Sequence, residues 1–195
     1  MWLTLPWDDP RIRWFEREGY RPVGASRYMY LDDASAVASD ETERLGRGDL
    51  RLELERIDHR TSSRTRAARD VAAVIADAFD LEPAFHVLVE ADVIQMLDVP
   101  TIGFVLARLD GESVAVARRT TDRGGSLLAA IGTRRAARGR GLGRLVTAAA
   151  TRDALAAGSD TVFLGVEDGN DVARHLYERL GYVFADGGMT ALLRR

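Results

Sequence analysis

The sequence predicts an α/β fold with a mixed, mostly antiparallel sheet and flanking helices. Two observations support this prediction. Three strand-like runs separated by glycine turns follow one another between residues 101 and 133, and a short apolar run at 161–166 lies between two segments of helical periodicity. Strands joined by tight turns pair antiparallel, whereas a strand that follows a crossover helix pairs parallel to the strand before it. The order of these runs therefore predicts an antiparallel three-stranded meander, followed by a helix that leads to a parallel strand.

One strand and two helices are expected before the meander. Leucines at alternate positions over residues 50–54 are separated by charged residues, which indicates a strand with one buried face. The serines at 62–63 are placed to cap a helix whose apolar stripe ends at Phe79. A second helix is expected to begin at Pro83.

The elements after the meander are predicted from their glycines and apolar spacing. A helix begins after Gly143 and ends at Gly158, and another begins at Asp168 or Asn170 and ends at Gly181. The chain is then expected to close with a β-hairpin formed by the runs 182–185 and 189–193, with Asp-Gly-Gly between them.

Composition excludes several classes of protein. A formal net charge of -3 argues against a protein whose main task is coating nucleic acid. The chain has no cysteine, and each of its 27 cationic side chains is arginine, so thiolate nucleophiles, Cys-ligated zinc and lysine Schiff bases are absent. No run approaches the roughly 20 apolar residues of a membrane span, and residues 1–10 do not resemble a signal peptide. We therefore expect a cytoplasmic protein without a membrane or nucleic-acid partner.

A glycine-rich basic turn between a predicted strand and a predicted helix is the candidate ligand site. It has the sequence RGRGLG over residues 138–143, and further arginines flank it. Backbone N–H groups and the helix dipole converge on an anion at such a place, and glycine lets the main chain approach closely. The spacing does not fit the dinucleotide fingerprint G-x-G-x-x-G.

This turn resembles the signature of the GCN5-related N-acetyltransferases, R/Q-x-x-G-x-G/A after a central strand, which occurs here as Arg138, Gly141 and Gly143. A second element of that family, an Asn followed by Ala, Leu-Tyr and Gly with an aromatic residue, is similar to NDVARHLYERLGY from Asn170. The resemblance covers residues 49–195. It implies two central strands that splay apart, with acetyl-CoA between them.

The resemblance also implies roles for individual residues. Backbone groups of Ile131 and Thr133 would bind pantetheine, Asn170 would contact the cofactor arm, and Tyr177 would protonate the leaving thiolate. The pyrophosphate would lie on the turn, formed by Arg138, Gly139, Arg140, Gly141, Leu142, Gly143 and Arg144. An alternative for Tyr177 is a purely structural aromatic side chain at helical spacing from Ala173.

The general base is left open by the sequence. The family often places a Glu on the central strand, but SLLAAIGT contains no carboxylate. Glu112, Glu167, Asp168 and His86 are the alternatives. His59 and His175 have no partner at ligand spacing, so no metal site is predicted.

Residues 1–48 are expected to form an extension and linker outside the domain of residues 49–195. Seven of the 14 aromatic residues lie within the first 30 positions, so the extension must bury an aromatic face. Residues 14–31 align with 176–193, with Glu, Arg, Gly and Tyr coinciding. We interpret the extension as the last helix and hairpin of a second acetyltransferase-like domain, which mediates homodimerisation or extends the sheet edge.

Two functions remain open on the sequence. The first is an N-acetyltransferase that moves an acetyl group from acetyl-CoA to the amine of a small molecule or peptide, by direct attack in a ternary complex. The second is an acyl-CoA-binding regulatory module without turnover, which the missing strand carboxylate permits. An arginine-patch protein that binds nucleic acid is disfavoured.

Overall fold

The computed structural model describes residues 2–37, 52–79, 88–122 and 124–194. The strands are β1 (Trp2–Pro6), β2 (Tyr20–Leu31), β3 (Leu52–Ile57), β4 (Ile102–Leu109), β5 (Glu112–Asp122), β6 (Gly125–Thr133), β7 (Thr161–Glu167) and β8 (Tyr182–Arg194). The helices are α1 (Ile12–Arg17), α3 (Arg64–Phe79), α4 (Glu90–Met96), the 3-10 turn η1 (Arg135–Ala137), α5 (Leu142–Ala156) and α6 (Asp171–Glu178). Within these ranges the strands form one sheet, in the order β1-β8-β2-β7-β6-β5-β4-β3.

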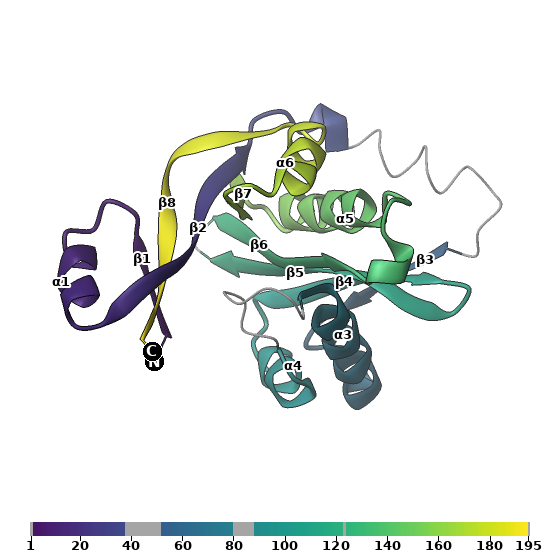
Figure 1. Ribbon diagram of the computed structural model, residues 1–195. Helices are drawn as coiled ribbons and strands as arrows, with labels where there is room; N and C mark the ends of the chain where they lie inside the picture. Colours follow the sequence, from purple (N-terminus) through teal and green to yellow (C-terminus); the bar gives the residue numbers. More distant parts are fainter. Residues whose placement is uncertain (1, 38–51, 80–87, 123, 195) are drawn as a thin grey trace.

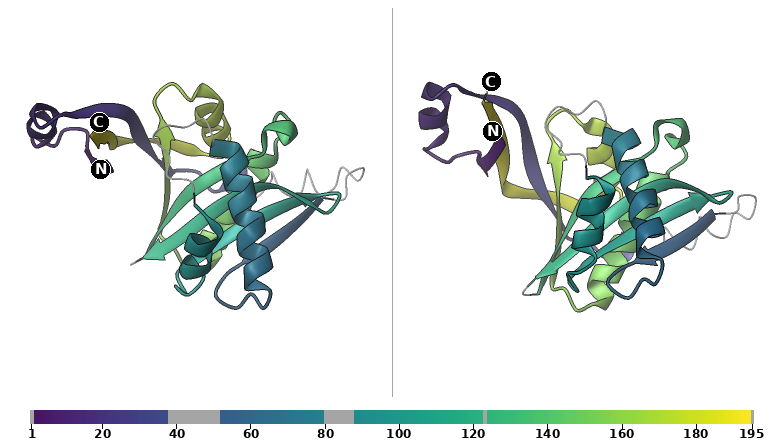
Figure 2. Two further views of the ribbon diagram at one scale, coloured as in Figure 1. Left: turned by 60° about the horizontal axis from the view of Figure 1, so that its bottom comes forward. Right: turned by 90° about the horizontal axis from the view of Figure 1, so that it is seen from below.

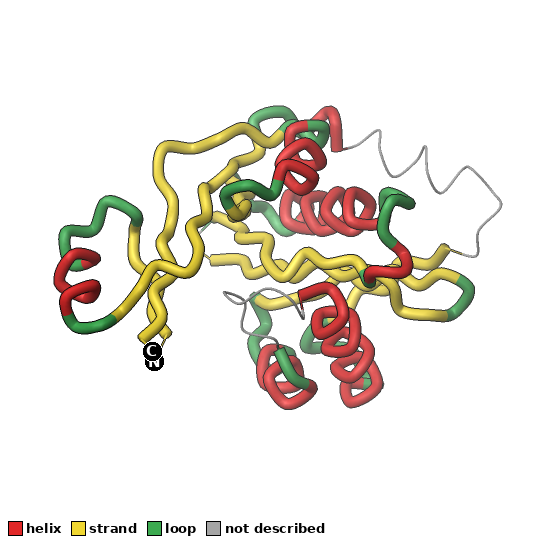
Figure 3. Tube along the Cα trace, viewed as in Figure 1, coloured by secondary structure: helices red, strands yellow, loops and turns green. Residues whose placement is uncertain are grey.

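Helices cover both faces of the sheet (Figure 1, Figure 3). Helices α5 and α6 lie on one face, where Leu145, Val146 and Leu164 belong to a buried apolar cluster. Helices α3 and α4 lie on the other, where Val71, Ile75 and other apolar residues pack against β4 and β5. The two clusters hold the central strands rigidly between helices.

The predicted fold class is confirmed, and the meander forms as expected. Strands β4, β5 and β6 pair antiparallel, and Asp110 and Gly111 both have positive φ in the first turn. Helix α5 then crosses over so that β7 pairs parallel to β6. The helix ends before Gly158, whose φ is +85°, as its sequence predicts.

The predicted closing hairpin is wrong. Residues Tyr182–Arg194 form the single long strand β8, which pairs antiparallel with β2 along most of its length and with β1 near its end. The Asp-Gly-Gly run that suggests a turn instead lies opposite a register shift between Arg27 and Met29 of β2. A bulge accommodates the extra residues without reversing the chain.

The N-terminal extension enters the sheet (Figure 2). It forms a helix as predicted, but β2 is one strand, not a hairpin, and it lies between β7 and β8. The series β1, α1, β2 and the series β7, α6, β8 share the order strand, helix, strand. Strand β2 pairs with β7 and β8 of the second series, and strand β8 pairs with β1 and β2 of the first. This explains the internal sequence likeness in structural terms.

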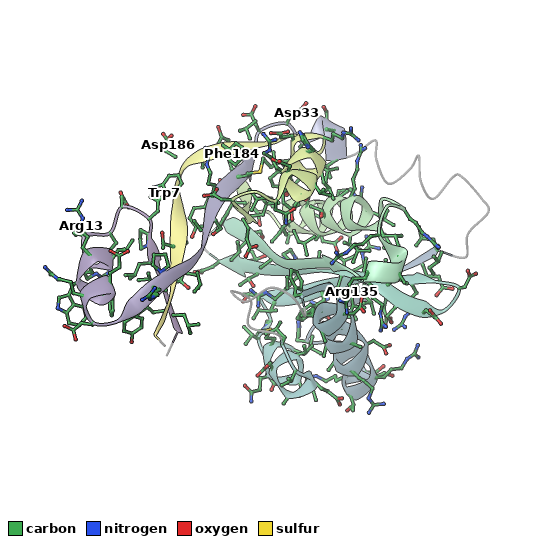
Figure 4. All side chains as sticks on the ribbon, in the orientation of Figure 1. Trp7, Arg13, Asp33, Arg135, Phe184 and Asp186 are labelled. Atoms are coloured by element: carbon green, nitrogen blue, oxygen red, sulfur yellow. The ribbon has the colours of Figure 1, made fainter. Side chains whose placement is uncertain are left out.

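The outer half of this arrangement projects from the helix-covered part of the sheet. Helix α1 buries none of its residues, and Trp7 and Trp14 are 41% and 50% exposed. Figure 4 shows Trp7 beside β8 and Phe184 further along the same strand. The Arg27 guanidinium lies 3.9 Å from the centre of the Phe184 ring, which links β2 to β8 by a cation–π contact.

Two further expectations differ from the structure. The second helix begins at Glu90, because the Asp92 carboxylate accepts the Val89 N–H and caps it there; Pro83 lies outside the described residues. The predicted linker contains Val37, which is fully buried in the α5 cluster and whose carbonyl accepts a bond from Arg152. The first part of the linker is therefore packed against the domain.

A buried ion cluster ties β3 to α3 and gives a stability prediction. The Arg108 side chain is 8% exposed and donates to Glu55 at 2.8 Å, Asp70 at 2.7 Å and Ser113 at 2.7 Å. We expect Arg108→Ala to lower the free energy of unfolding by about 2–3 kcal/mol, because Glu55 and Asp70 both lose their buried partner and Asp70 keeps only a longer contact with the exposed Arg66. Urea denaturation measures this.

The matched control for this prediction is Arg66→Ala. Arg66 contacts the same Asp70 at 3.8 Å, but its side chain is 71% exposed. Its replacement should change the free energy of unfolding by less than about 0.5 kcal/mol. If Arg108→Ala and Arg66→Ala lowered the free energy of unfolding equally, the contacts of Arg108 would not be stronger than that of Arg66, which would contradict the prediction.

Candidate active site

Two parallel strands separate in the middle of the sheet. The pairing of β6 with β7 ends at Leu128 and Leu164, although both strands continue for several residues. Beyond that point β6 pairs only with β5, and β7 pairs only with β2. The N–H and C=O groups of residues 129–133 that face β7 therefore have no ladder partner there, and an extended ligand with amide groups can take that place.

The strands separate at a distortion of β6. Ala130 has a φ of +47°, which is unusual for a residue with a Cβ, and the register against β5 shifts between Val116 and Arg118. Such a bulge turns backbone groups away from the ladder. Strained backbone of this kind concentrates at functional sites, and here it lies where the gap opens.

A large cleft follows the gap. Its volume is about 1540 Å³, above the 300–1,000 Å³ usual for small-ligand pockets. The structure brings every predicted site residue to its wall: Ile131, Thr133, Arg138, Gly139, Arg140, Gly141, Leu142, Gly143, Arg144, Asn170 and Tyr177. Residues from β6, the loop before α5, the end of β7 and α6 thus form one continuous surface.

The glycine-rich turn presents the N-terminus of α5 to the cleft. Gly141 is the N-cap of the helix with a φ of +73°, and the first intrahelical bond runs from the Leu145 N–H to its carbonyl. The N–H groups before that bond have no acceptor within the helix and lie at the positive end of its dipole. An anion bound at this end of the cleft would therefore be stabilised.

The side chain of Arg138 holds the turn in place. It donates to the carbonyl of Ala78 at 2.9 Å and to that of Thr133 at 3.3 Å, so it joins the end of α3 to the end of β6. Nearby, the Arg135 N–H donates to the Asp77 carboxylate at 2.7 Å; Figure 4 marks Arg135 at η1. These bonds fix the turn relative to the central strand.

Asn170 begins α6 at the opposite wall. Its side-chain oxygen accepts the Ala173 N–H at 3.1 Å, which confirms it as the N-cap. The cap places Asn170 at the cleft that the turn before α5 also lines. The wall beside it is completed by Ala173 and Leu176 of α6.

Tyr177 lies both in the core and on the cleft wall. Its ring is 6% exposed and packs edge-on against Tyr182, with ring centroids 6.3 Å apart. Its hydroxyl makes no hydrogen bond to any described residue, whereas the Tyr182 hydroxyl bonds Thr151 at 2.6 Å. Burial raises the pKa of the Tyr177 phenol far above its ordinary value, so the phenol stays protonated at neutral pH.

The two buried tyrosines predict how stability depends on pH. Burial also raises the pKa of Tyr182, and with no lysine or cysteine in the chain, tyrosines dominate titration between about pH 9 and 11.5. Because the folded-state pKa exceeds the unfolded one, the stabilisation is complete below about pH 10 and is lost as pH rises above it. We expect a fall of about 1.4 kcal/mol per pH unit for each buried tyrosine.

Urea denaturation between pH 9 and 11.5 checks this dependence. Tyr177→Phe and Tyr182→Phe should each make the fall shallower, because each removes one buried phenol. A slope that neither buried substitution alters would contradict the prediction.

The candidate bases separate into two groups. Glu167 and Asp168, at the end of β7, line the cleft, whereas Glu112 does not; His86 lies outside the described residues. His175 of α6 also lines it. Over the ranges that the structure describes, no cluster of His, Cys, Asp or Glu could hold a metal ion, and no helix could cross a membrane.

The sequence interpretation missed several wall residues. Gly132 lies where the end of α3 crosses β6, and a Cβ there would meet Ala78 at 2.8 Å and Phe79 at 2.9 Å. A glycine inside a strand is a signal of such close approach. The conformation of Ala130 has no signal in the sequence, because alanine does not favour positive φ.

Comparison with known proteins gives a partial family match. The family model described as "FR47-like protein" matches residues 102–187. Mycothiol acetyltransferase from Gordonia bronchialis is 50% identical over 52 residues, which are 27% of this chain and 17% of that protein. The chain thus matches about a sixth of that relative's length.

Solved structures share the fold along nearly the whole chain. A GCN5-related N-acetyltransferase from Kribbella flavida has a TM-score of 0.65 and 23% identity, covering 98% of this chain and 66% of that one. A protein of the same description from Sphaerobacter thermophilus has a TM-score of 0.66 and 18% identity, covering 98% and 58%. A tandem GNAT protein from the clavulanic acid biosynthesis pathway has a TM-score of 0.63 and 15% identity, covering 98% and 63%.

These likenesses agree with the geometry of the site. The family model spans β4 to the middle of β8, and so includes the gap, the glycine-rich turn and α6. The chain thus shares the fold of solved GCN5-related N-acetyltransferases, and its residues 102–187 match the FR47-like family model.

Proposed function

We propose that the protein transfers an acetyl group from acetyl-CoA to a primary amine by direct attack in a ternary complex. The observation that supports this best is the continuity of the unpaired edge of β6 with the N-terminus of α5 along one cleft. A ligand with an extended amide-containing arm and a phosphorylated end matches both features.

The residues of the cleft fit acetyl-CoA. The exposed backbone groups of Ile131 and Thr133 would pair with the amides of pantetheine, and the N–H groups of residues 141–144 would bind the pyrophosphate. Arg140 and Arg144 line the same end of the cleft and would add charge-assisted bonds. Asn170 would donate its side-chain amide from the opposite wall.

The reaction needs one bond to form and one to break. The amine nitrogen attacks the thioester carbonyl carbon, the C–N bond forms, and the C–S bond breaks to release the CoA thiolate. The chain has no cysteine to carry the acetyl group, which favours direct attack over a thioester intermediate on the protein. Backbone N–H groups at the bulge around Ala130 would stabilise the developing oxyanion.

Two proton transfers complete the step. The attacking amine loses its proton to Glu167 or Asp168, the carboxylates that line the cleft, directly or through water. Tyr177 donates its phenolic proton to the leaving thiolate. With ordinary pKa values of about 10 and 8.5 this transfer is uphill by roughly 2 kcal/mol, and burial makes it steeper. Reprotonation through water in the bound complex would offset that cost.

The test is release of free CoA from acetyl-CoA with a panel of amines. Turnover with any amine supports the proposal. Acetyl-CoA binding without turnover on every acceptor would instead favour the silent acyl-CoA-binding module, which a β6 without a carboxylate permits. A homodimer through residues 1–48 and a cytoplasmic location stay predictions, which gel filtration and fractionation address.

A further inference from the structure

One arginine beside the gap has no counter-charge among the residues that the structure describes. Arg118 on β5 is partly buried, and its Nε atom is fully buried without a hydrogen-bond partner. Its guanidinium contacts the Met96 sulfur of α4, 3.8 Å from Nη1. A thioether is a weak acceptor. Burial lowers the pKa of Arg118, and no carboxylate of the described residues opposes that shift.

Arg108 on the neighbouring strand β4 is a buried arginine whose charge is compensated, and it serves for comparison. Two carboxylates and a hydroxyl surround its guanidinium at 2.7–2.8 Å. A buried guanidinium without such partners is costly and remains charged. Arg118 therefore carries a positive charge that the described part of the fold leaves uncompensated, and a bound anion would compensate it.

The position of Arg118 relates it to the reacting atoms. It pairs with Ala129 of β6, next to the bulge at Ala130, and the pairing of β6 with β7 ends one residue earlier. Directly paired residues on adjacent strands lie about 4.5–5.5 Å apart at Cα. The guanidinium is thus one strand away from the place where the gap opens.

Arg118 lies on the face of the sheet that carries α3 and α4. Its contact with Met96 places it on the α3 and α4 side of the sheet, as does the packing of Val116, two residues before it. The opposite face is filled by α5, whose buried alanines pack against the central strands. An amine that approached the gap from the side of α4 would pass the guanidinium.

We infer that Arg118 binds an anionic group of the acceptor, so that the preferred substrates are amines that also carry a carboxylate or a phosphate. This inference rests on the proposed acetyl transfer. Arg118 fixes the end of the acceptor away from the reacting nitrogen and determines specificity. A guanidinium binds either anion with two parallel bonds, and the test separates the two.

The experiment compares acceptors that differ only in charge. Glycine is paired with glycinamide, dipeptides with their amides, and phosphoethanolamine with ethanolamine, in the wild type and in Arg118→Gln. We expect the ratio of kcat/KM for anionic over neutral acceptors to fall at least tenfold in the variant, the loss expected for charge-assisted bonds. The amines of a pair differ in basicity, but this difference is the same for both proteins, so it cancels when the ratio in the wild type is compared with the ratio in Arg118→Gln. Carboxylate and phosphate pairs show which anion is preferred.

Control variants separate specificity from packing. Arg66→Gln, at an exposed arginine of α3, should leave the ratio unchanged. Arg118→Met should keep or raise Tm, because it removes an uncompensated charge, while it abolishes the preference. A fall in Tm with an unchanged preference would show that Arg118 acts only in packing, and would overturn the inference.

Failure of the inference differs from failure of the proposed activity. A wild type that prefers neutral amines, or an Arg118→Gln variant that keeps the preference, refutes the role of Arg118 but not acetyl transfer. If no acceptor turns over, the same compounds are titrated calorimetrically into the protein saturated with CoA. Selective binding of the anionic members, lost in Arg118→Gln, would still support the site, and equal binding or none would refute it.

Discussion

Replacing Gly141 with valine is expected to weaken acetyl-CoA binding by about a hundredfold or more. Gly141 has a φ of +73°, in the left-handed region, and a β-branched side chain is strained there. Relaxation of the turn would rotate the N–H groups at the start of α5 away from the cleft. Loss of two charge-assisted bonds, each about 1.5–3 kcal/mol, gives a change of this size. Calorimetric titration with acetyl-CoA measures it.

The control for this substitution lies at the other end of the same helix. Gly158 has a φ of +85°, and a Cβ there would meet no heavy atom within 4 Å. It does not line the cleft. Gly158→Val should therefore cause a comparable backbone strain, seen as a lower Tm, without a change in acetyl-CoA affinity. If Gly141→Val binds acetyl-CoA as the wild type does, the pyrophosphate is not held at this turn.

Replacing Tyr177 with phenylalanine is expected to lower kcat by about a hundredfold, the lower range for loss of a general acid. Acetyl-CoA affinity should change little, because the ring and its contact with Tyr182 remain. Stability near neutral pH should also change little, since the Tyr177 hydroxyl has no hydrogen-bond partner among the described residues. Steady-state kinetics with the best acceptor from the amine panel checks the effect.

Tyr182→Phe, the control, is expected to lower stability and not kcat. Its hydroxyl bonds Thr151 at 2.6 Å, and Tyr182 does not line the cleft. The substitution should lower the free energy of unfolding by about 1 kcal/mol and leave kcat unchanged. A Tyr177→Phe variant with unaltered kcat would assign Tyr177 to the core alone.

Features that depend on local backbone chemistry could be predicted from the sequence. The turn at Asp110 and the cap at Asn170 follow from side chains that favour those conformations wherever they occur. The anion-binding turn is predicted for the same reason, because glycines and arginines between a strand and a helix favour one chemistry. The predicted site residues gather on one cleft because these local features lie on consecutive elements of the crossover unit.

Features that depend on distant partners could not be predicted. The Asp-Gly-Gly run within β8 has the composition of a turn, and only the presence of β2 alongside makes it part of a strand. The isolation of Arg118 is of the same kind, since a sequence does not show which carboxylates a strand will face. Long-range pairing therefore decides both the sheet order and the uncompensated charge.

The place of β2 in the sheet has a consequence for how the chain folds. Tyr20 pairs with Arg194 and Tyr30 with Phe163, so β2 can pair only after β7 and β8, which are synthesised later, are available. Contacts this distant in sequence slow folding, because loop closure precedes any gain from pairing. We expect the β3–β6 meander to form first and the β2–β7–β8 region last. Until then the cleft would have only one wall, and acetyl-CoA binding would report completion of folding.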